Sequence, residues 1–237
     1  MLSQPVRGYR AATDPVLLAA SVPARPGESV LELGIGAGAA TLCLAARVGG
    51  LALAGLELQP GYAALARANA ARAGAAVEVI EGDVAAMPRS LRARRFDHVA
   101  LNPPWHAHGP ASAAPARDLA HREAAEGASL ERWIAAALAR ARPRGRVTIV
   151  HRAEALDRLL AALSGAAGEI RVKPLQPRPG RAAGRVIVTA RTQVRAPLRL
   201  LAPLVLHEGA AHTGDREDFT AEARAILRDA APLDLSD

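Results

Sequence analysis

Short apolar runs alternate with longer alanine-rich segments along most of the chain. Seven runs rich in Val, Leu, Ile or Ala predict strands, at residues 29–33, 51–57, 77–83, 96–102, 146–151, 169–175 and 184–192. Segments with helical spacing lie between them, at residues 39–47, 60–73, 129–141 and 153–164. Alternation of buried strands with helices predicts an α/β fold whose seven-stranded, Rossmann-like sheet is mostly parallel. The last two strands are joined only by QPRPGRAA, which is too short for a crossover, so they should form an antiparallel hairpin.

The composition limits the class of protein but does not indicate a function. Half of the 237 residues are hydrophobic and 3% are aromatic, enough for one large core. The net charge is +7, but 29 of the 30 basic residues are Arg, a bias that can belong to a whole genome. Cys43 is the one cysteine, which excludes a disulfide framework and a zinc cluster of cysteines. The N-terminus offers no signal peptide and no run is long enough to span a membrane, so we expect a cytoplasmic protein.

Glycines and acids follow the first three predicted strands. Gly34, Gly36 and Gly38 lie where the first strand turns into a helix, so a ligand can approach the backbone beside a helix N-terminus. Glu57 ends the second strand, where it could accept hydrogen bonds from ribose hydroxyls. Asp83 ends the third strand, and with the amide of Val84 it could bracket an adenine edge. Strand ends of a parallel sheet line one crevice, so these residues predict a nucleotide-cofactor site.

The fourth strand ends in LNPPW, residues 101–105. Proline cannot continue a strand, and the two prolines hold the carbonyl of Pro103 outward. An amide before the prolines and a tryptophan after them suggest more than a structural turn.

These segments resemble the class I S-adenosylmethionine-dependent methyltransferases. The resemblance is carried by VLELGIGAGAATLCLA, LELQP, EGDV and LNPPW, and NPPW is similar to the motif of those members that methylate planar amino or amide nitrogens. It implies S-adenosyl-L-methionine as cofactor and a catalytic set of Asn102, Pro103, Pro104 and Trp105. In this set the Asn102 side-chain oxygen and the Pro103 carbonyl would accept the two hydrogens of an amino group whose lone pair is delocalised. Trp105 would offer a flat face for a base removed from its stack. The resemblance also implies cofactor contacts, which are Tyr9, Asp14, Glu32, Gly34, Gly36, Gly38, Glu57, Leu58, Asp83, Val84 and Asn102.

The flanking segments resemble one branch of that class. GYRAATDPVLLAA, residues 8–20, is similar to the opening of the bacterial tRNA1(Val) (adenine-37-N6)-methyltransferase family, as are the closing strands and final helix. The resemblance implies that this opening closes over the cofactor. We therefore expect one methyltransferase domain over residues 1–237: an N-terminal segment 1–28, a core 29–206 and an acidic tail with a helix, 207–237.

Charge is distributed unevenly along the sequence. Residues 140–199 hold 14 basic and three acidic residues, a balance of +11, whereas residues 207–237 have a balance of −5. Arg178, Arg181 and Arg185 fall in or beside the last hairpin connection, which we expect on the crevice side of the sheet. They are candidate contacts to RNA phosphates, with tRNA as the favoured RNA. No metal site is predicted, because the pair His106 and His108 lacks a third ligand nearby.

The resemblance favours N6-methylation of adenine in RNA, and four other functions compete with it. A glutamine amide is an alternative acceptor, but release-factor methyltransferases carry a helical domain before the glycine loop, and 33 residues precede Gly34 here. DNA adenine methylation would need a target-recognition segment that the sequence does not show. A non-catalytic RNA-binding module is disfavoured by the intact Glu57, Asp83 and Asn102. A dinucleotide oxidoreductase explains the glycines but leaves LNPPW without a role.

Overall fold

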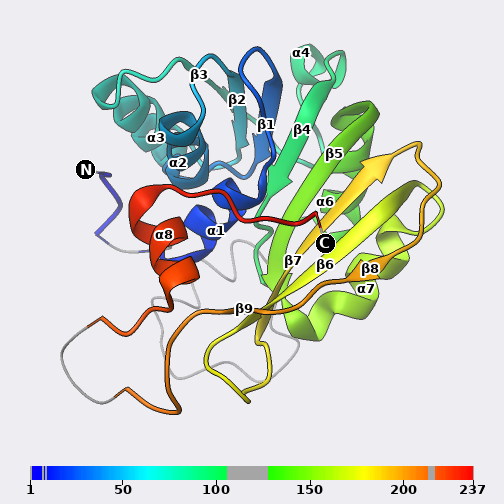
Figure 1. Ribbon diagram of the computed structural model, residues 1–237. Coiled ribbons are helices and arrows are strands. Elements are labelled where there is room, and N and C mark those ends of the chain that lie inside the picture. The colour runs from blue at the N-terminus through cyan, green and yellow to red at the C-terminus, as the bar shows by residue number, and fades with distance from the viewer. Residues whose placement is uncertain (1, 7, 9, 106–127, 213–216, 237) are drawn as a thin grey trace.

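The computed structural model describes residues 2–6, 8, 10–105, 128–212 and 217–236, and these form a mixed sheet flanked by helices (Figure 1). In this part of the chain the sheet has nine strands in the order β3-β2-β1-β4-β5-β7-β6-β8, and β9 pairs with β6. The strands are β1 Ser29–Leu33, β2 Ala52–Glu57, β3 Val77–Glu81, β4 Phe96–Leu101, β5 Ala141–Arg152, β6 Ala167–Gln176, β7 Arg185–Thr192, β8 Arg199–Leu200 and β9 Leu204–Val205.

The predicted fold is confirmed in its main features. The first five strands pair parallel, and β7 is antiparallel to both β5 and β6, as the short hairpin connection predicts. Strand β5 begins at Ala141 rather than at residue 146, because Ala141 pairs with Phe96 ahead of a register shift. The strands β8 and β9 were not predicted, since two residues are too few to form a recognisable pattern.

Helices cover both faces of the sheet. They are α1 Asp14–Ser21, α2 Ala39–Arg47, α3 Pro60–Arg72, α4 Arg89–Arg92, α6 Leu130–Arg140, the 3-10 turn η1 Ala153–Ala155, α7 Leu156–Leu163 and α8 Ala221–Asp229. Helices α1, α2 and α8 share one buried cluster, and α4, α6 and α7 share another. Local sequence explains the helix starts: Pro60 occupies the first turn of α3, and the Ser129 hydroxyl accepts a hydrogen bond from the Arg132 amide in α6.

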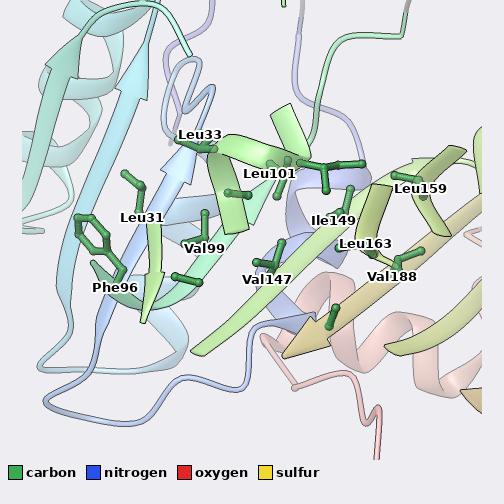
Figure 2. Close-up of a cluster of buried hydrophobic side chains, with 14 of the residues drawn as sticks. Leu31, Leu33, Phe96, Val99, Leu101, Val147, Ile149, Leu159, Leu163 and Val188 are labelled. Atoms are coloured by element: carbon green, nitrogen blue, oxygen red, sulfur yellow. The ribbon is translucent and has the colours of Figure 1, made fainter. Parts of the chain in front are cut away.

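The larger core lies between the sheet and helices α6 and α7. Figure 2 shows Leu31, Val99, Val147 and Val188, which come from the four neighbouring strands β1, β4, β5 and β7. All four are 0% exposed, as is Leu163 of α7. Burying a side chain of this size contributes about 1.5–3 kcal/mol, so this layer fixes the central strands rigidly below the crevice.

Candidate active site

The carboxyl ends of β3, β2, β1 and β4 lie side by side at one edge of the sheet. Leu33 is in register with both Leu56 and Leu101, and Glu57 and Asn102 come next in their segments. The chain moves from β1 outward to β2 and β3 and then returns to place β4 on the other side of β1. Such a reversal of strand order is where open α/β sheets bind ligands.

The glycine loop follows β1 directly. Gly34, Gly36 and Gly38 have φ values of +72°, +55° and +90°, a backbone conformation that residues other than glycine rarely adopt. A Cβ on Gly36 would meet nothing within 4 Å, whereas a Cβ on Gly34 would lie 2.9 Å from the Trp133 ring of α6. The loop therefore leaves open space beside Gly36 and lies against an indole that the sequence did not mark as part of the site.

Glu57 holds this loop in place. Its Oε2 accepts a hydrogen bond of 2.9 Å from the Gly36 amide, and its Oε1 accepts one of 2.9 Å from the Gln59 amide. The side chain is 7% exposed. A carboxylate has about four acceptor sites, so both oxygens retain capacity for ligand hydroxyls. The sequence predicted a ligand-binding role for Glu57, and the structure adds a role in shaping the loop.

The remaining residues predicted for the nucleotide lie around Glu57. Leu58 follows Glu57 directly and is 55% exposed, so its apolar side chain is available to contact a ligand. Strand β3 ends at Glu81 rather than at residue 83, so Asp83 belongs to the turn beyond the strand. Its Oδ1 accepts a 2.8 Å hydrogen bond from the Ala85 amide, and Val84 packs against the larger core.

Glu32 lies on the other face of β1 from Leu31 and Leu33. Its Oε2 accepts hydrogen bonds from the amide and the hydroxyl of Thr41, in the first turn of α2. The side chain is buried, and this desolvation raises the pKa of the carboxyl to about 7, although the Thr41 hydrogen bonds act in the opposite direction. Glu32 thus joins the strand before the glycine loop to the helix after it.

The N-terminal segment is tied to the site at two points. Asp14, in the first turn of α1, is buried and forms an ion pair with Arg185 at the start of β7. Asn69 of α3, 2% exposed, donates to the carbonyls of Ser3 and of Ala37 in the glycine loop, at 2.8 and 2.9 Å. Asn69 was not predicted; a lone amide within an alanine-rich helix is its only signal in the sequence. Tyr9 lies outside the described residues.

The predicted acceptor motif extends from the end of β4. Pro103 is buried, and Asn102, Pro104 and Trp105 are partly exposed. The end of β5 forms a wall beside the indole of Trp105. The His151 ring meets that indole edge-on at 6.4 Å between centroids, and the Arg152 guanidinium lies 5.0 Å from its centroid. Neither His151 nor Arg152 was predicted, because the sequence gives no sign of which side chains flank the motif.

The three arginines predicted to contact RNA differ in their surroundings. The hairpin connection lies at the crevice edge as expected, since β7 begins beside the carboxyl end of β5. However, Arg178 pairs with Asp218, and Arg185 pairs with Asp14, so internal carboxylates already compensate both charges. Arg181 is exposed, and its amide bonds the Arg178 carbonyl. Of the three, Arg181 is the best placed for a phosphate.

No group of three or more His, Cys, Asp or Glu side chains among the described residues could hold a metal ion, and His106 and His108 lie outside those residues. No helix among the described residues is long and apolar enough to cross a membrane.

The strand order, the glycine loop and the acids at consecutive strand ends define a nucleotide-cofactor-binding protein of the α/β class. The open space beside Gly36, the carboxylate of Glu57 and the exposed Leu58 match a ligand with a ribose and a flat apolar base.

Comparison with known proteins identifies the class more closely. A family described as a methyltransferase domain matches residues 30–126. A tRNA1(Val) (adenine(37)-N6)-methyltransferase of Shewanella halifaxensis is 31% identical over 160 residues, 66% of this chain and 63% of that protein. A release factor glutamine methyltransferase of Geobacter sulfurreducens is 38% identical over 77 residues, 32% of this chain and 26% of that protein. The solved structure of a predicted O-methyltransferase, Atu636 of Agrobacterium tumefaciens, matches 93% of this chain and 98% of its own, with a TM-score of 0.73 and 28% identity.

These similarities support the assignment of the chain to the class I S-adenosylmethionine-dependent methyltransferases, the class that the sequence motifs resemble. The cofactor of this class is S-adenosylmethionine, which the crevice residues fit. The chain spans less than two thirds of the length of the two curated relatives compared here.

Proposed function

We propose that this protein methylates the exocyclic N6 amino group of an adenine in RNA, with tRNA as the favoured substrate. The observation that carries the proposal is the placement of Asn102-Pro103-Pro104-Trp105 at the end of β4, beside the β1 end that bears the glycine loop. When bound, S-adenosylmethionine supplies a methyl group on a positively charged sulfur. The side chains of this protein must present the nitrogen to it.

Asn102 and Pro103 activate the acceptor in this proposal. An adenine amino nitrogen is a poor nucleophile because its lone pair is delocalised into the ring. If the Asn102 side-chain oxygen and the Pro103 carbonyl accept its two hydrogens, the nitrogen becomes more tetrahedral and its lone pair is available. Pro103 is fixed by burial and by its own ring, so its carbonyl costs little to orient.

Trp105 positions the base in this proposal. Its indole is held by the edge contact with His151 and by the Arg152 guanidinium. A base taken out of its stack could lie against the indole, and such stacking contributes about 1–3 kcal/mol per base. On the cofactor side, Glu57 and Asp83 would accept hydrogen bonds from the ribose and the adenine, and Leu58 would cover the base.

The domain organisation belongs to the same proposal. Residues 29–206 would form the catalytic core, residues 1–28 would cover the cofactor, and residues 207–237 would brace the N-terminal helix. The Asp14–Arg185 ion pair and the bond between Asn69 and Ser3 support a fixed N-terminal segment. In line with this, Leu233 donates its amide to the Ala20 carbonyl of α1.

The relatives support RNA over protein as substrate. The tRNA1(Val) methyltransferase aligns with 66% of the chain, whereas the release factor glutamine methyltransferase aligns with 32%. Because Asn-Pro-Pro motifs suit both nitrogens, the glutamine amide is retained as the second candidate.

One experiment separates these substrates. The protein is incubated with methyl-labelled S-adenosylmethionine and, in parallel, bacterial tRNA, genomic DNA or purified release factor. Labelled RNA is digested to nucleosides and separated by chromatography. We expect the label in N6-methyladenosine from tRNA, and none with Asn102→Ala. Label in a glutamine of the release factor, or in DNA alone, would refute the proposal.

A further inference from the structure

Arginines gather at the sheet edge opposite the crevice. Arg92 ends α4, Arg95 immediately precedes β4, Arg140 ends α6, and Arg142 and Arg144 lie at the start of β5. Pairing of β4 with β5 at their first residues brings these segments together. We call these five residues the arginine edge. In Figure 1 it lies beside α4 at the top of the view, and β4 runs downward from it toward the crevice.

Most of this charge is not compensated. The Arg140 guanidinium donates to the carbonyls of Leu91 and Arg94, each at 3.1 Å, and that of Arg95 donates to two carbonyls of the segment 139–141. Carbonyls orient a guanidinium but do not neutralise it. Burial and then the charges of Arg95 and Arg92 lower the pKa of Arg140, so these like charges are close enough to repel one another.

Only one carboxylate pairs with the arginine edge in the described part of the chain. Asp97 accepts from Arg142 at 2.6 Å. The exposed Arg92 and Arg144 form no side-chain ion pair within the described residues. Five guanidiniums against one carboxylate leave a formal excess of four positive charges.

The excess continues along the neighbouring strands. Arg146 of β5, Arg171 of β6 and Arg191 of β7 all approach the one carboxylate of Glu169, at 2.9, 3.1 and 3.2 Å. The Nε of Arg171 is buried without a hydrogen-bond partner in the described structure. Three guanidiniums around one carboxylate add two further positive charges next to Arg144.

We propose that the arginine edge binds the phosphate backbone of the RNA substrate at a distance from the acceptor crevice. This rests on the proposed function. Guanidinium groups already aligned by carbonyls retain free N–H donors that match phosphate oxygens, and a polyanion relieves the repulsion between them. Strand β4 has six residues, which rise about 3.3 Å each, so Arg95 and Asn102 at its two ends are roughly 20–25 Å apart. An RNA that is contacted at both places must therefore extend along one side of the sheet.

The test removes Arg92 and Arg144, the two exposed members of the arginine edge whose side chains form no hydrogen bond or ion pair within the described residues. Arg92→Gln with Arg144→Gln takes away two positive charges without disturbing the carbonyl-bound Arg95 and Arg140. Affinity for unfractionated bacterial tRNA is measured at several salt concentrations. Each phosphate contact contributes about 0.7–0.9 to the slope of log affinity against log salt, so the slope should fall by about 1.5. The rate at saturating tRNA should be unchanged, since binding is lost equally in ground and transition states.

A matched control removes the same charge elsewhere. Arg67→Gln with Arg72→Gln on α3 should leave the salt slope as in the wild type, although Arg67 gives up an exposed pair with Glu81 and Arg72 gives up hydrogen bonds to Ser3 and Asn69. A short adenine-containing trinucleotide, which cannot reach the arginine edge from the crevice, should be methylated equally by wild type and by the Arg92/Arg144 variant.

The outcomes separate the two proposals. If the wild type methylates tRNA and the Arg92/Arg144 variant keeps the wild-type slope, the arginine edge does not bind RNA, while the proposed function stands. If the wild type methylates no RNA, the proposed function itself fails.

Discussion

Replacing Glu32 with Gln should remove a decline in stability that the wild-type protein undergoes as the pH rises. Burial raises the pKa of Glu32 from an ordinary 4.5 to about 7, against the opposing hydrogen bonds from Thr41. The side chain is 6% exposed, so solvent screens this effect little. In the unfolded chain the carboxyl returns to water and ionises near its ordinary value.

The direction of the pH dependence follows from the protons that the folded and unfolded states bind. Between pH 4.5 and about 7 the folded protein holds a proton on Glu32 that the unfolded chain has lost. The free energy of unfolding therefore falls with rising pH, by about 1.4 kcal/mol per pH unit over this interval. The contribution is complete below the lower pKa and is lost once the pH passes the upper one. One pKa unit corresponds to about 1.36 kcal/mol, so the total loss is roughly 3 kcal/mol.

The measurement is urea unfolding of wild type and Glu32→Gln, followed by circular dichroism from pH 4.5 to 8. Glutamine has the same shape and cannot ionise, so the free energy of unfolding of the variant should not show this decline. Compared with the wild type, the variant should become more stable by roughly 3 kcal/mol as the pH rises across the range. Glu78→Gln is the control, because Glu78 is a surface carboxylate paired with Arg94. Wild-type and Glu32→Gln curves that stay parallel across this range would show that the carboxyl is already ionised in the fold.

Three further outcomes follow from the site. Asn102→Ala should lower the single-turnover rate of methyl transfer by about 100-fold or more, since the contact of Asn102 with the activated acceptor nitrogen forms only in the transition state. Cofactor affinity measured by calorimetry should stay within a few-fold of the wild type, and a near-normal turnover rate would contradict this role. Glu57→Ala should weaken cofactor binding by about 1–3 kcal/mol, because it leaves the Gly36 and Gln59 amides unpaired as well as the ribose; unchanged calorimetric affinity would refute the assignment. Trp105→Ala should raise KM for RNA while Trp105→Phe largely restores it, as stacking needs only a flat ring; equal effects of the two changes would argue against stacking.

The strands could be predicted because they carry their own signal. Buried strands must be apolar along several consecutive residues, and seven such runs were found in the correct places. Helix α1 was not predicted as a helix: its DPVLLAAS sequence is buried almost all round and so shows no polar face. The first residues of β5 are polar and basic, and they are in the sheet only because the neighbouring strand pairs with them.

The position of the site could be predicted from the sequence better than the contacts that its residues make. Strand ends of a parallel sheet lie at one edge, which is why the glycine loop, Glu57 and Asn102 could be grouped from sequence. The Asp14–Arg185 pair joins residues 171 positions apart, and no local pattern encodes it. The count of charges over residues 140–199 was correct, but a strand carries its two ends to opposite edges of the sheet. Three of those 14 basic residues, Arg140, Arg142 and Arg144, therefore lie at the arginine edge rather than beside the crevice.

Helix α1 also joins parts of the chain that lie far apart in the sequence. Leu17, Leu18 and Ala20 share a buried cluster with Ala223, Ile226 and Leu233, which follow them by more than 200 positions. The same cluster contains Ala40 and Leu44 of α2, so α1 links α8 to the helix that follows the glycine loop. A change that detaches α8 should therefore also uncover part of α1 and loosen the segment that lies next to the cofactor site.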